Sequence, residues 1–222
     1  MNHKFQAKLE EIKTTLPPNA HLLIVSKTRS IQEIKDYYEL GHRDFGENRV
    51  QELSEKALAL KDDCPEIRWH MIGHLQSNKV GQLLKVPNLH FIHSVHDKDL
   101  LEKILKAESK IDHPISIFLQ YNTSMEEEKS GFENYQDLKD AAKLLLSSHY
   151  LRLVGLMTMG TLRTENFTDE AKRCFHQLSE IKNTLSLELS TPLELSMGMS
   201  QDYLIALQEG ANWIRLGTVM FV

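Results

Sequence analysis

The chain alternates short apolar runs with longer amphipathic segments, and this alternation limits the folds that it can adopt. Most of the runs are rich in Ile, Leu, Val or Phe, as expected for strands that are buried on both faces. The eight runs are Leu22–Ser26, Arg43–Gly46, Arg68–Gly73, His90–Val95, Ile115–Asn122, Leu151–Thr158, Leu193–Met197 and Trp213–Thr218. Strands that alternate with helices predict a parallel sheet.

The segments between the runs carry the end signals of helices. Ser30 followed by Glu33 predicts a capping box, and Gly41 is placed to end the same helix. Near the C-terminus, Ser200 is expected to cap a helix that Gly210 ends. These signals support helices between the strands.

Eight strands in this pattern suggest one closed (βα)8 barrel of the TIM type, and we expect residues 1–222 to form a single domain. The alternative is an open doubly wound sheet, but no Gly-x-Gly-x-x-Gly loop follows any strand. The sequence ends four residues after the last run, so an eighth helix is expected either to be missing or to lie beyond Val222. We expect a helix around residues 3–15 to cover that part of the barrel.

Composition excludes several classes of protein. Net charge is −5 with a pI near 6.1, and basic clusters are absent, which argues against a nucleic-acid surface. No apolar run approaches the roughly 20 residues of a membrane helix, and the N-terminus lacks an apolar signal core. We therefore expect a cytoplasmic protein without a membrane partner. Cys64 and Cys174 are isolated and are expected to be reduced thiols.

Polar and small residues gather at the C-terminal ends of the runs, which meet at one mouth of a barrel, where such folds carry their chemistry. Lys27 follows the first run directly, so its amine is expected to be partly desolvated and neutral. A neutral amine condenses with an aldehyde to form a Schiff base. The alternatives are a lysine that reaches the surface, or one that pairs with a carboxylate such as Glu47.

The last two runs add features of a phosphate site, because barrels often bind phosphate with the loops after strands seven and eight. Ser200 offers a hydroxyl at a predicted helix N-terminus, Gly217 allows a close approach to the backbone, and Thr218 adds a second hydroxyl. A helix cap and a tight turn would explain Ser200 and Gly217 equally well when each is taken alone.

Arg215 alternates with Gly217 along the last run, so its side chain can point into the barrel, where a guanidinium needs a partner. A heteroaromatic nitrogen and a carboxylate are both possible partners. The histidines do not predict a metal site. His70 and His74 have the spacing of zinc ligands only on a helix, and no third ligand stands out.

Several segments resemble the pyridoxal 5′-phosphate (PLP) homeostasis proteins, a family of small PLP-binding barrels related to the N-terminal domain of alanine racemase. The matching segments run in order through nearly the whole chain: Val25–Thr28, Phe45–Glu52, Trp69–Lys79, Lys129–Gly131, Gly155–Met157, Leu195–Ser200 and Arg215–Thr218. Two departures stand out. The family usually has Asp where this chain has His96, and it usually continues with Gly and a short tail after the final Phe. The first departure bears on a loop contact, and the second on barrel closure and the edge of the site.

The resemblance implies a binding site for PLP, the vitamin B6 cofactor, at the mouth of the barrel. The implied residues are Lys27 as the Schiff-base lysine, Ser200, Gly217, Thr218 and Ser196 at the phosphate, Arg215 at the pyridine nitrogen, and Asn48 near the ring. It also implies a regulator of PLP and amino-acid balance without catalysis. Its expected partners are PLP and apo forms of PLP-dependent enzymes, and its expected state is a monomer or weak dimer.

The alternative function is a PLP-dependent amino-acid racemase. Arginine at the pyridine nitrogen weakens the ring as an electron sink, and racemisation needs a second base, which related racemases take from another domain or subunit. Tyr121 is near a strand end, but its side chain should point away from the neighbouring Gln120 and Asn122. A third possibility is a barrel with a structural lysine and an unrelated phosphate ligand. The sequence favours the PLP carrier.

Overall fold

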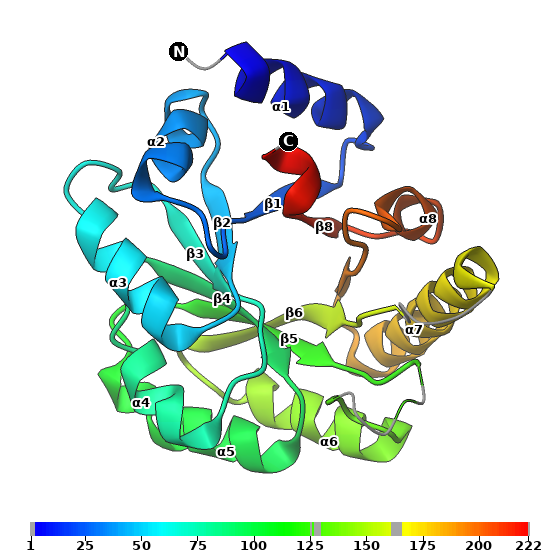
Figure 1. Ribbon diagram of the computed structural model, residues 1–222. Helices are drawn as coiled ribbons and strands as arrows, with labels where there is room; N and C mark the ends of the chain where they lie inside the picture. The colour runs from blue at the N-terminus through cyan, green and yellow to red at the C-terminus, as the bar shows by residue number, and fades with distance from the viewer. Residues whose placement is uncertain (1–2, 125, 127–129, 161–165, 222) are drawn as a thin grey trace.

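The computed structural model describes residues 3–124, 126, 130–160 and 166–221, and its eight parallel strands close into a barrel in sequence order (Figure 1). The strands are β1 (His21–Val25), β2 (Asp44–Glu47), β3 (Arg68–Met71), β4 (Leu89–Val95), β5 (Ile115–Gln120), β6 (Leu151–Met157), β7 (Glu194–Ser196) and β8 (Trp213–Leu216). β8 pairs with β1, with Leu22 opposite Ile214, so the sheet closes without an open edge. The predicted (βα)8 barrel is confirmed.

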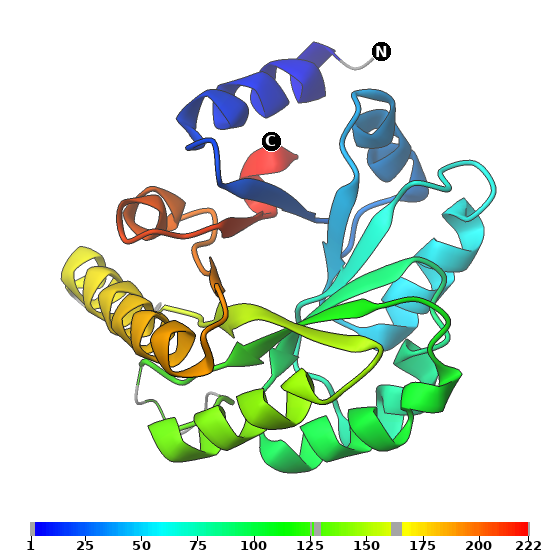
Figure 2. The same cartoon turned by 180° about the vertical axis from the view of Figure 1, so that it is seen from behind.

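Helices surround the barrel, as Figures 1 and 2 show from opposite sides. They are α1 (His3–Thr15), α2 (Ile31–Glu39), α3 (Val50–Leu60), α4 (Val80–Leu83), α5 (Lys98–Lys106), α6 (Tyr135–Leu146), α7 (Phe167–Leu189) and α8 (Tyr203–Gln208). Ser30 and Glu33 form the predicted capping box at the start of α2. None of the helices in the described ranges is long and apolar enough to cross a membrane.

The start of α8 differs from the prediction. The helix begins at Tyr203 with Asp202 at the N-cap, and Ser200 lies in the preceding turn. The Asp202 carboxylate accepts a hydrogen bond of 2.5 Å from the Met199 N–H, which folds residues 199–202 into a turn ahead of the helix. Gly210 follows the helix with a φ of +90°, as predicted for a helix stop.

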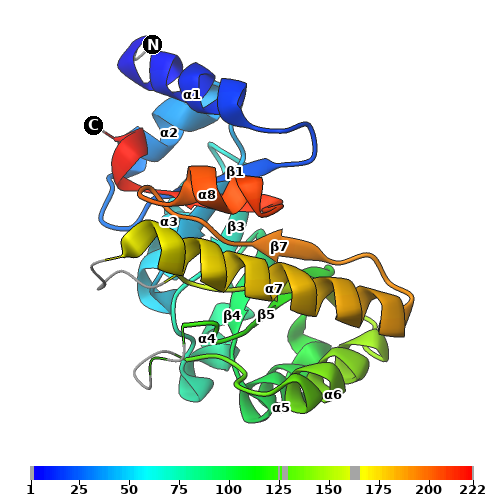
Figure 3. The same ribbon diagram turned by 90° about the vertical axis from the view of Figure 1, so that its right-hand side faces the viewer.

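Helix α1 covers the side of the barrel that has no helix after β8, as expected from the sequence (Figure 3). The Phe5 ring stacks on Tyr37 of α2 at 4.7 Å and meets the edge of Phe221 at 5.8 Å. The Tyr37 hydroxyl donates to the Met220 carbonyl in the short 3₁₀ turn η3 (Thr218–Met220). These contacts hold the segment after β8 against the outside of the barrel.

An aromatic and apolar layer fills the inside of the barrel below its mouth. Leu23, Phe118, Met157 and Trp213 form a buried cluster there. Two histidines are packed into the same layer. His70 stacks on Phe91 with ring centroids 4.2 Å apart, and His93 stacks on Phe118 with centroids 4.4 Å apart. This layer closes the mouth from below and separates it from a second pocket at the N-terminal ends of the strands, which His21, Arg68 and His113 help to line.

Three buried histidines predict that the protein loses stability in mild acid. Burial lowers the pKa of His42 to about 4, and it also lowers the pKa values of His70 and His93. Below about pH 6.5 the unfolded imidazoles bind protons that the folded ones exclude, so the unfolded state is stabilised relative to the folded state as pH falls. His42 alone is expected to lower the free energy of unfolding by about 2 kcal/mol between pH 7 and pH 5.

Urea unfolding at the two pH values measures this loss. Glu47 and Asp202, whose pKa values are raised by burial, act in the opposite direction, so variants must isolate the histidine contribution. His42→Gln is expected to reduce the pH dependence, whereas the exposed control His149→Gln should leave it unchanged. An equal pH dependence in wild type and His42→Gln would contradict the prediction.

Candidate functional site

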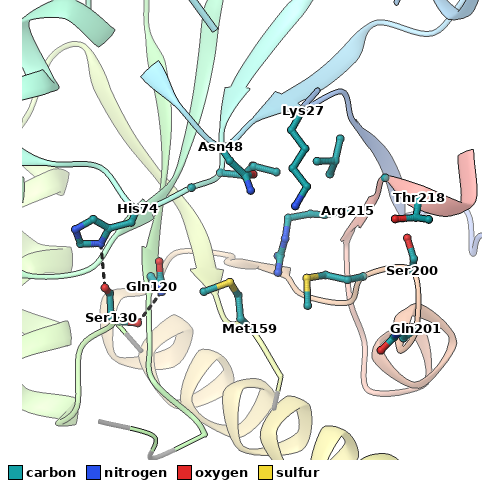
Figure 4. A pocket seen from close by; sticks show the side chains of 15 residues that line it. Lys27, Asn48, His74, Gln120, Ser130, Met159, Ser200, Gln201, Arg215 and Thr218 are labelled. Atoms are coloured by element: carbon teal, nitrogen blue, oxygen red, sulfur yellow. Dashed lines mark hydrogen bonds between the residues drawn. The ribbon is translucent and has the colours of Figure 1, made fainter. Parts of the chain in front are cut away.

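A pocket of ≈ 470 Å³ opens at the C-terminal ends of the strands (Figure 4). Its volume lies in the range of small-molecule sites, about 300–1,000 Å³. Six of the seven residues predicted for the site line this pocket: Lys27, Asn48, Ser200, Arg215, Gly217 and Thr218. The structure therefore brings together residues from both ends of the sequence.

Lys27 follows β1, and its side chain points into the pocket toward Arg215 (Figure 4). The turn around it is fixed by two backbone hydrogen bonds of 3.0 Å, from Ser26 N–H to Gly46 O and from Arg29 N–H to Ser26 O. Lys27 is exposed, so the expectation that the strand partly desolvates its amine is wrong. The reason is that the chain turns out of the sheet directly after the buried Ser26.

A buried ionic cluster supports this turn from below. Lys56 on α3 donates to Glu47 Oε1 at 2.8 Å, to Glu52 Oε1 at 2.7 Å and to the Ser26 carbonyl at 2.6 Å. Glu47 also accepts from the Ser26 hydroxyl at 2.7 Å, and Glu52 accepts from the Thr28 N–H at 2.7 Å. Burial raises the pKa of Glu47, although the hydrogen bonds from Lys56 and Ser26 oppose this shift. Glu47 therefore pairs with Lys56 and leaves the Lys27 amine available.

Thr28 shows how tightly the turn is held. Its φ is +62°, in the left-handed region that β-branched residues rarely adopt. Such a conformation persists only where the surroundings enforce it, and here Glu52 binds the Thr28 N–H. The residue next to Lys27 is thus fixed at a cost in backbone energy.

Asn48 is placed in the pocket by a close approach of two loops. A Cβ atom on Gly73, which follows β3, would lie 2.1 Å from the Asn48 carbonyl oxygen. Only glycine lets the loop after β3 pass this close to the loop after β2. This contact explains why a glycine stands at position 73, and it fixes the backbone of Asn48.

Arg215 on β8 lies at the base of the pocket and is almost completely buried. Its guanidinium donates from Nη1 to Ser196 Oγ at 2.8 Å and from Nη2 to the Thr158 carbonyl at 2.9 Å. Burial lowers its pKa to about 10, opposed by the charge of Asp202, so the group remains a cation at neutral pH. In the described part of the chain, Arg215 forms no salt bridge with a carboxylate.

Ser196 does not line the pocket, unlike the other predicted residues. Its side chain is fully buried below the mouth, because strand alternation turns it into the barrel interior. Its hydroxyl is bonded to Arg215 and to His93 Nδ1, the latter at 2.8 Å. The structure thus corrects its predicted position at the phosphate, and Ser196 instead supports Arg215.

Hydrogen-bond donors gather at the end of the pocket formed by Ser200 and Thr218, whose hydroxyls face each other in Figure 4. The backbone N–H groups of Ser200, Gln201 and Thr218 donate to no acceptor within the residues that the structure describes. A Cβ atom on Gly217 would meet Val25 at an ordinary 3.4 Å, so packing within the chain does not require glycine there. This end of the pocket is suited to an anion with several oxygen atoms.

Further side chains of the lining were not predicted as site residues: His74, Gln120, Ser130, Met159, Met199 and Gln201. Gln120 donates to the Ser130 carbonyl at 2.6 Å, and the Ser130 hydroxyl bonds to His74 Nδ1 at 2.9 Å. His74 also stacks on His96, the residue that departs from the family pattern, at 4.4 Å. The available signal for most of them was a position at or soon after the end of a strand, whereas Ser130 lies farther along the loop after β5.

Two predicted features lie outside the described residues, namely Lys129 of one matching segment and the final Val222. No group of three or more His, Cys, Asp or Glu is arranged to hold a metal ion among the residues with described positions.

The comparisons with known proteins agree with this geometry. The chain matches the N-terminal domain of alanine racemase over residues 2–222. It is 36% identical over 203 residues to the pyridoxal phosphate homeostasis protein of Schizosaccharomyces pombe, covering 91% of this chain and 84% of that protein. The chain belongs to the pyridoxal phosphate homeostasis protein family. Its human relative of the same name is 34% identical over 229 residues, covering 100% of this chain and 83% of the relative.

Solved structures support the same assignment. PipY of Synechococcus elongatus PCC7942, solved with PLP bound, is 32% identical and superposes with a TM-score of 0.86 over 98% of this chain and 100% of its own. Alanine racemase of Clostridium difficile 630 has a TM-score of 0.78 over 99% of this chain and 56% of its own. At 13% identity, this second likeness shows the fold alone.

Proposed function

We propose that this protein binds PLP as a Schiff base on Lys27 and acts in PLP homeostasis as a carrier or regulator. The observation that carries the proposal is one pocket that combines an exposed lysine amine, a buried guanidinium and a group of unpaired N–H donors. Membership of the family and the PLP-bound structure of PipY support the same ligand.

The residues present fit PLP at three places. The hydroxyls of Ser200 and Thr218, with the backbone donors beside them, would hold the phosphate, whose oxygen atoms supply the acceptors that these donors lack. Arg215 would keep donors for the pyridine nitrogen, because a guanidinium has five N–H groups and two of them are bonded to other residues that the structure describes. Lys27 would bind the aldehyde, and Asn48 would contact the ring.

Bound PLP supplies an electron-withdrawing ring that can stabilise a carbanion. In this chain Arg215 would moderate that property. The guanidinium keeps its proton at neutral pH, so it would donate a hydrogen bond to the ring nitrogen of bound PLP and leave that nitrogen unprotonated. A residue in this role favours holding the cofactor over using it as an electron sink.

The alternative function, amino-acid racemisation, would need a second base in the pocket. Tyr121 is buried and its hydroxyl donates to the Glu133 carbonyl at 3.1 Å, away from the pocket, while burial raises its pKa. Apart from Lys27 and Arg215, His74 is the titratable side chain among the described residues of the lining, and its Nδ1 bonds to Ser130. Incubation of the PLP-loaded protein with single amino-acid enantiomers tests this alternative. Steady conversion of one enantiomer into the other would contradict the proposed carrier function.

Borohydride reduction tests the linkage itself. Reducing the PLP-treated protein should fix one cofactor per chain, and peptide mass spectrometry should locate it on Lys27. The remaining lysines serve as internal controls, because borohydride also records weak Schiff bases at exposed amines. Equal labelling of many lysines, or none at Lys27, would refute the proposed linkage.

The carrier role is tested by transfer. The loaded protein is mixed with an apo form of a PLP-dependent enzyme, and recovered enzyme activity is followed over time. We expect faster recovery than with the same concentration of free PLP. If the recovery does not exceed that of free PLP, the protein does not deliver the cofactor.

A further inference from the structure

A continuous chain of hydrogen bonds crosses the inside of the barrel, from the N-terminal ends of the strands to the base of the pocket. We propose that Asp44, His70, His93 and Ser196 form a relay that positions Arg215 and stabilises its charge. These four are positioning residues, since only Arg215 faces the pocket. The inference deepens the proposed function and, in its effect on PLP, rests on it.

Four contacts make up the relay, and they join strands that are far apart in the sequence. Asp44 Oδ1 lies 3.1 Å from His70 Nε2, and His70 Nδ1 lies 3.0 Å from His93 Nε2. His93 Nδ1 is 2.8 Å from Ser196 Oγ, which is 2.8 Å from Arg215 Nη1. Each distance is that of an ordinary hydrogen bond.

The two fixed ends of the relay determine where every proton lies. Asp44 is a carboxylate, because hydrogen bonds from His70 and Arg68 hold its pKa below the ordinary value against the opposing effect of burial. It can only accept, so His70 carries its proton on Nε2 and accepts on Nδ1 from His93 Nε2–H. At the other end Arg215 can only donate, so the Ser196 hydroxyl accepts from Arg215 and gives its own proton to His93 Nδ1.

All donors of the relay therefore point toward Asp44. Each bond presents its negative end to the Arg215 side and its positive end to the Asp44 side, so the dipoles align between cation and anion. Aligned hydrogen bonds in a low-dielectric interior polarise and strengthen one another. The relay thereby provides a buried cation with acceptors, although no carboxylate touches it in the described part of the chain.

The surroundings keep both imidazoles neutral, as this pattern requires. His70 and His93 are fully buried, and burial lowers the pKa of each; for His93 the nearby charge of Arg215 acts in the same direction. The other charged or titratable groups around the relay are Arg68, which forms a salt bridge with Asp44, His42, whose Nε2 bonds the Asp44 carbonyl, His90, and Asp202 near Arg215. None of these enters the line of four bonds.

Two substitutions interrupt the relay at adjacent points. Ser196→Ala removes the acceptor of Arg215, and His93→Phe removes the acceptor of Ser196 while keeping a ring against Phe118. Each is expected to raise the dissociation constant for PLP about tenfold. Ser196→Ala takes one acceptor from the buried Arg215, and His93→Phe takes the acceptor of the Ser196 hydroxyl, which then no longer holds its oxygen toward Arg215. Both substitutions affect PLP through the same residue, Arg215. The double variant should therefore lose no more affinity for PLP than either single variant.

The matched control is Phe118→Leu, which removes the ring stacked on His93 at 4.4 Å but no hydrogen bond. It should lower stability and leave the PLP dissociation constant within about twofold. The relay variants should also shift the pH midpoint of the near-visible PLP band upward, because a cation held close to the Schiff base disfavours its protonation. Phe118→Leu should not move this midpoint. Relay variants that match Phe118→Leu in both readouts would overturn the inference.

Nitrogen-15 NMR of the PLP-free protein tests the relay without any cofactor. Both His70 and His93 should be neutral with the proton on Nε2, and Ser196→Ala should change the His93 Nδ1 signal. A proton on His93 Nδ1 would overturn the proposed direction of the bonds, even if Lys27 binds PLP. Conversely, if the protein binds no PLP but both histidines carry their protons on Nε2, the proposed function is refuted and the relay is supported. If His93→Phe does not fold, Ser196→Ala, which removes one oxygen atom, provides the same test.

Discussion

Replacement of Lys27 with alanine is expected to abolish the near-visible absorption band that PLP forms with this protein. The amine that would bind the aldehyde is lost, whereas the donors at Ser200 and Thr218 and the guanidinium of Arg215 remain. Binding should therefore weaken by about a hundredfold, which corresponds to about 2.7 kcal/mol, and not disappear. Absorbance titration gives the band, and equilibrium dialysis gives the dissociation constant.

Two control variants separate the chemistry of Lys27 from its charge and from general lysine reactivity. Lys27→Arg keeps a cation at the mouth but cannot form a Schiff base, so it should also lack the band. Lys61→Ala removes an exposed lysine directly after α3 and should leave the band and affinity unchanged. A persistent band in Lys27→Ala would mean that another amine binds PLP.

Lys56→Met is expected to cause the largest loss of stability, about 3–5 kcal/mol in the free energy of unfolding. The change leaves the fully buried Glu47 without its cation, and it also removes a donor from the Ser26 carbonyl. Because burial raises the pKa of Glu47, the unpaired carboxyl can take up a proton at mild acidity. The loss relative to wild type should therefore be greatest at pH 7 and smaller at pH 5.

Urea unfolding of wild type and variant at both pH values measures this effect. The double variant Lys56→Met with Glu47→Gln should recover part of the loss, because it removes the buried charge. Lys8→Met breaks an exposed ion pair with Glu11 of similar length, 2.6 Å, and should cost less than about 1 kcal/mol. An equal cost for Lys8→Met and Lys56→Met would show that burial does not govern the cluster.

Sequence periodicity was sufficient to locate the eight strands, because buried parallel strands are short apolar runs with little else to imitate them. It also located most of the pocket, since a barrel brings all strand ends to one mouth. Position along a strand did not reveal which way each group faces once the chain leaves the sheet. Lys27 therefore proved exposed. Ser196, one of the seven predicted residues, is still within β7, and its side chain points into the barrel below the pocket.

The hydrogen-bonding partners could not be predicted for a different reason. Asp44 and Ser196 belong to strands β2 and β7, and nothing local in the sequence indicates that two histidines connect them across the barrel. The turn before α8 was missed because Ser200 and Asp202 are both good cap residues, and the contact from Asp202 to Met199 decides between them. The hydrogen-bonding partners and the cap residue both depend on distances between side chains in the folded structure, which the local sequence does not give.

The pairing of β1 with β8 has a consequence for how the protein responds to its ligand. Lys27 follows β1 and Thr218 follows β8, so these two sides of the pocket are joined directly by the pairing at the seam where the barrel closes. A ligand that binds both sides cross-links this seam and must be released before the strands can separate. The loaded protein should thus resist local opening and proteolysis at the seam more than the free protein, even if their average structures are identical.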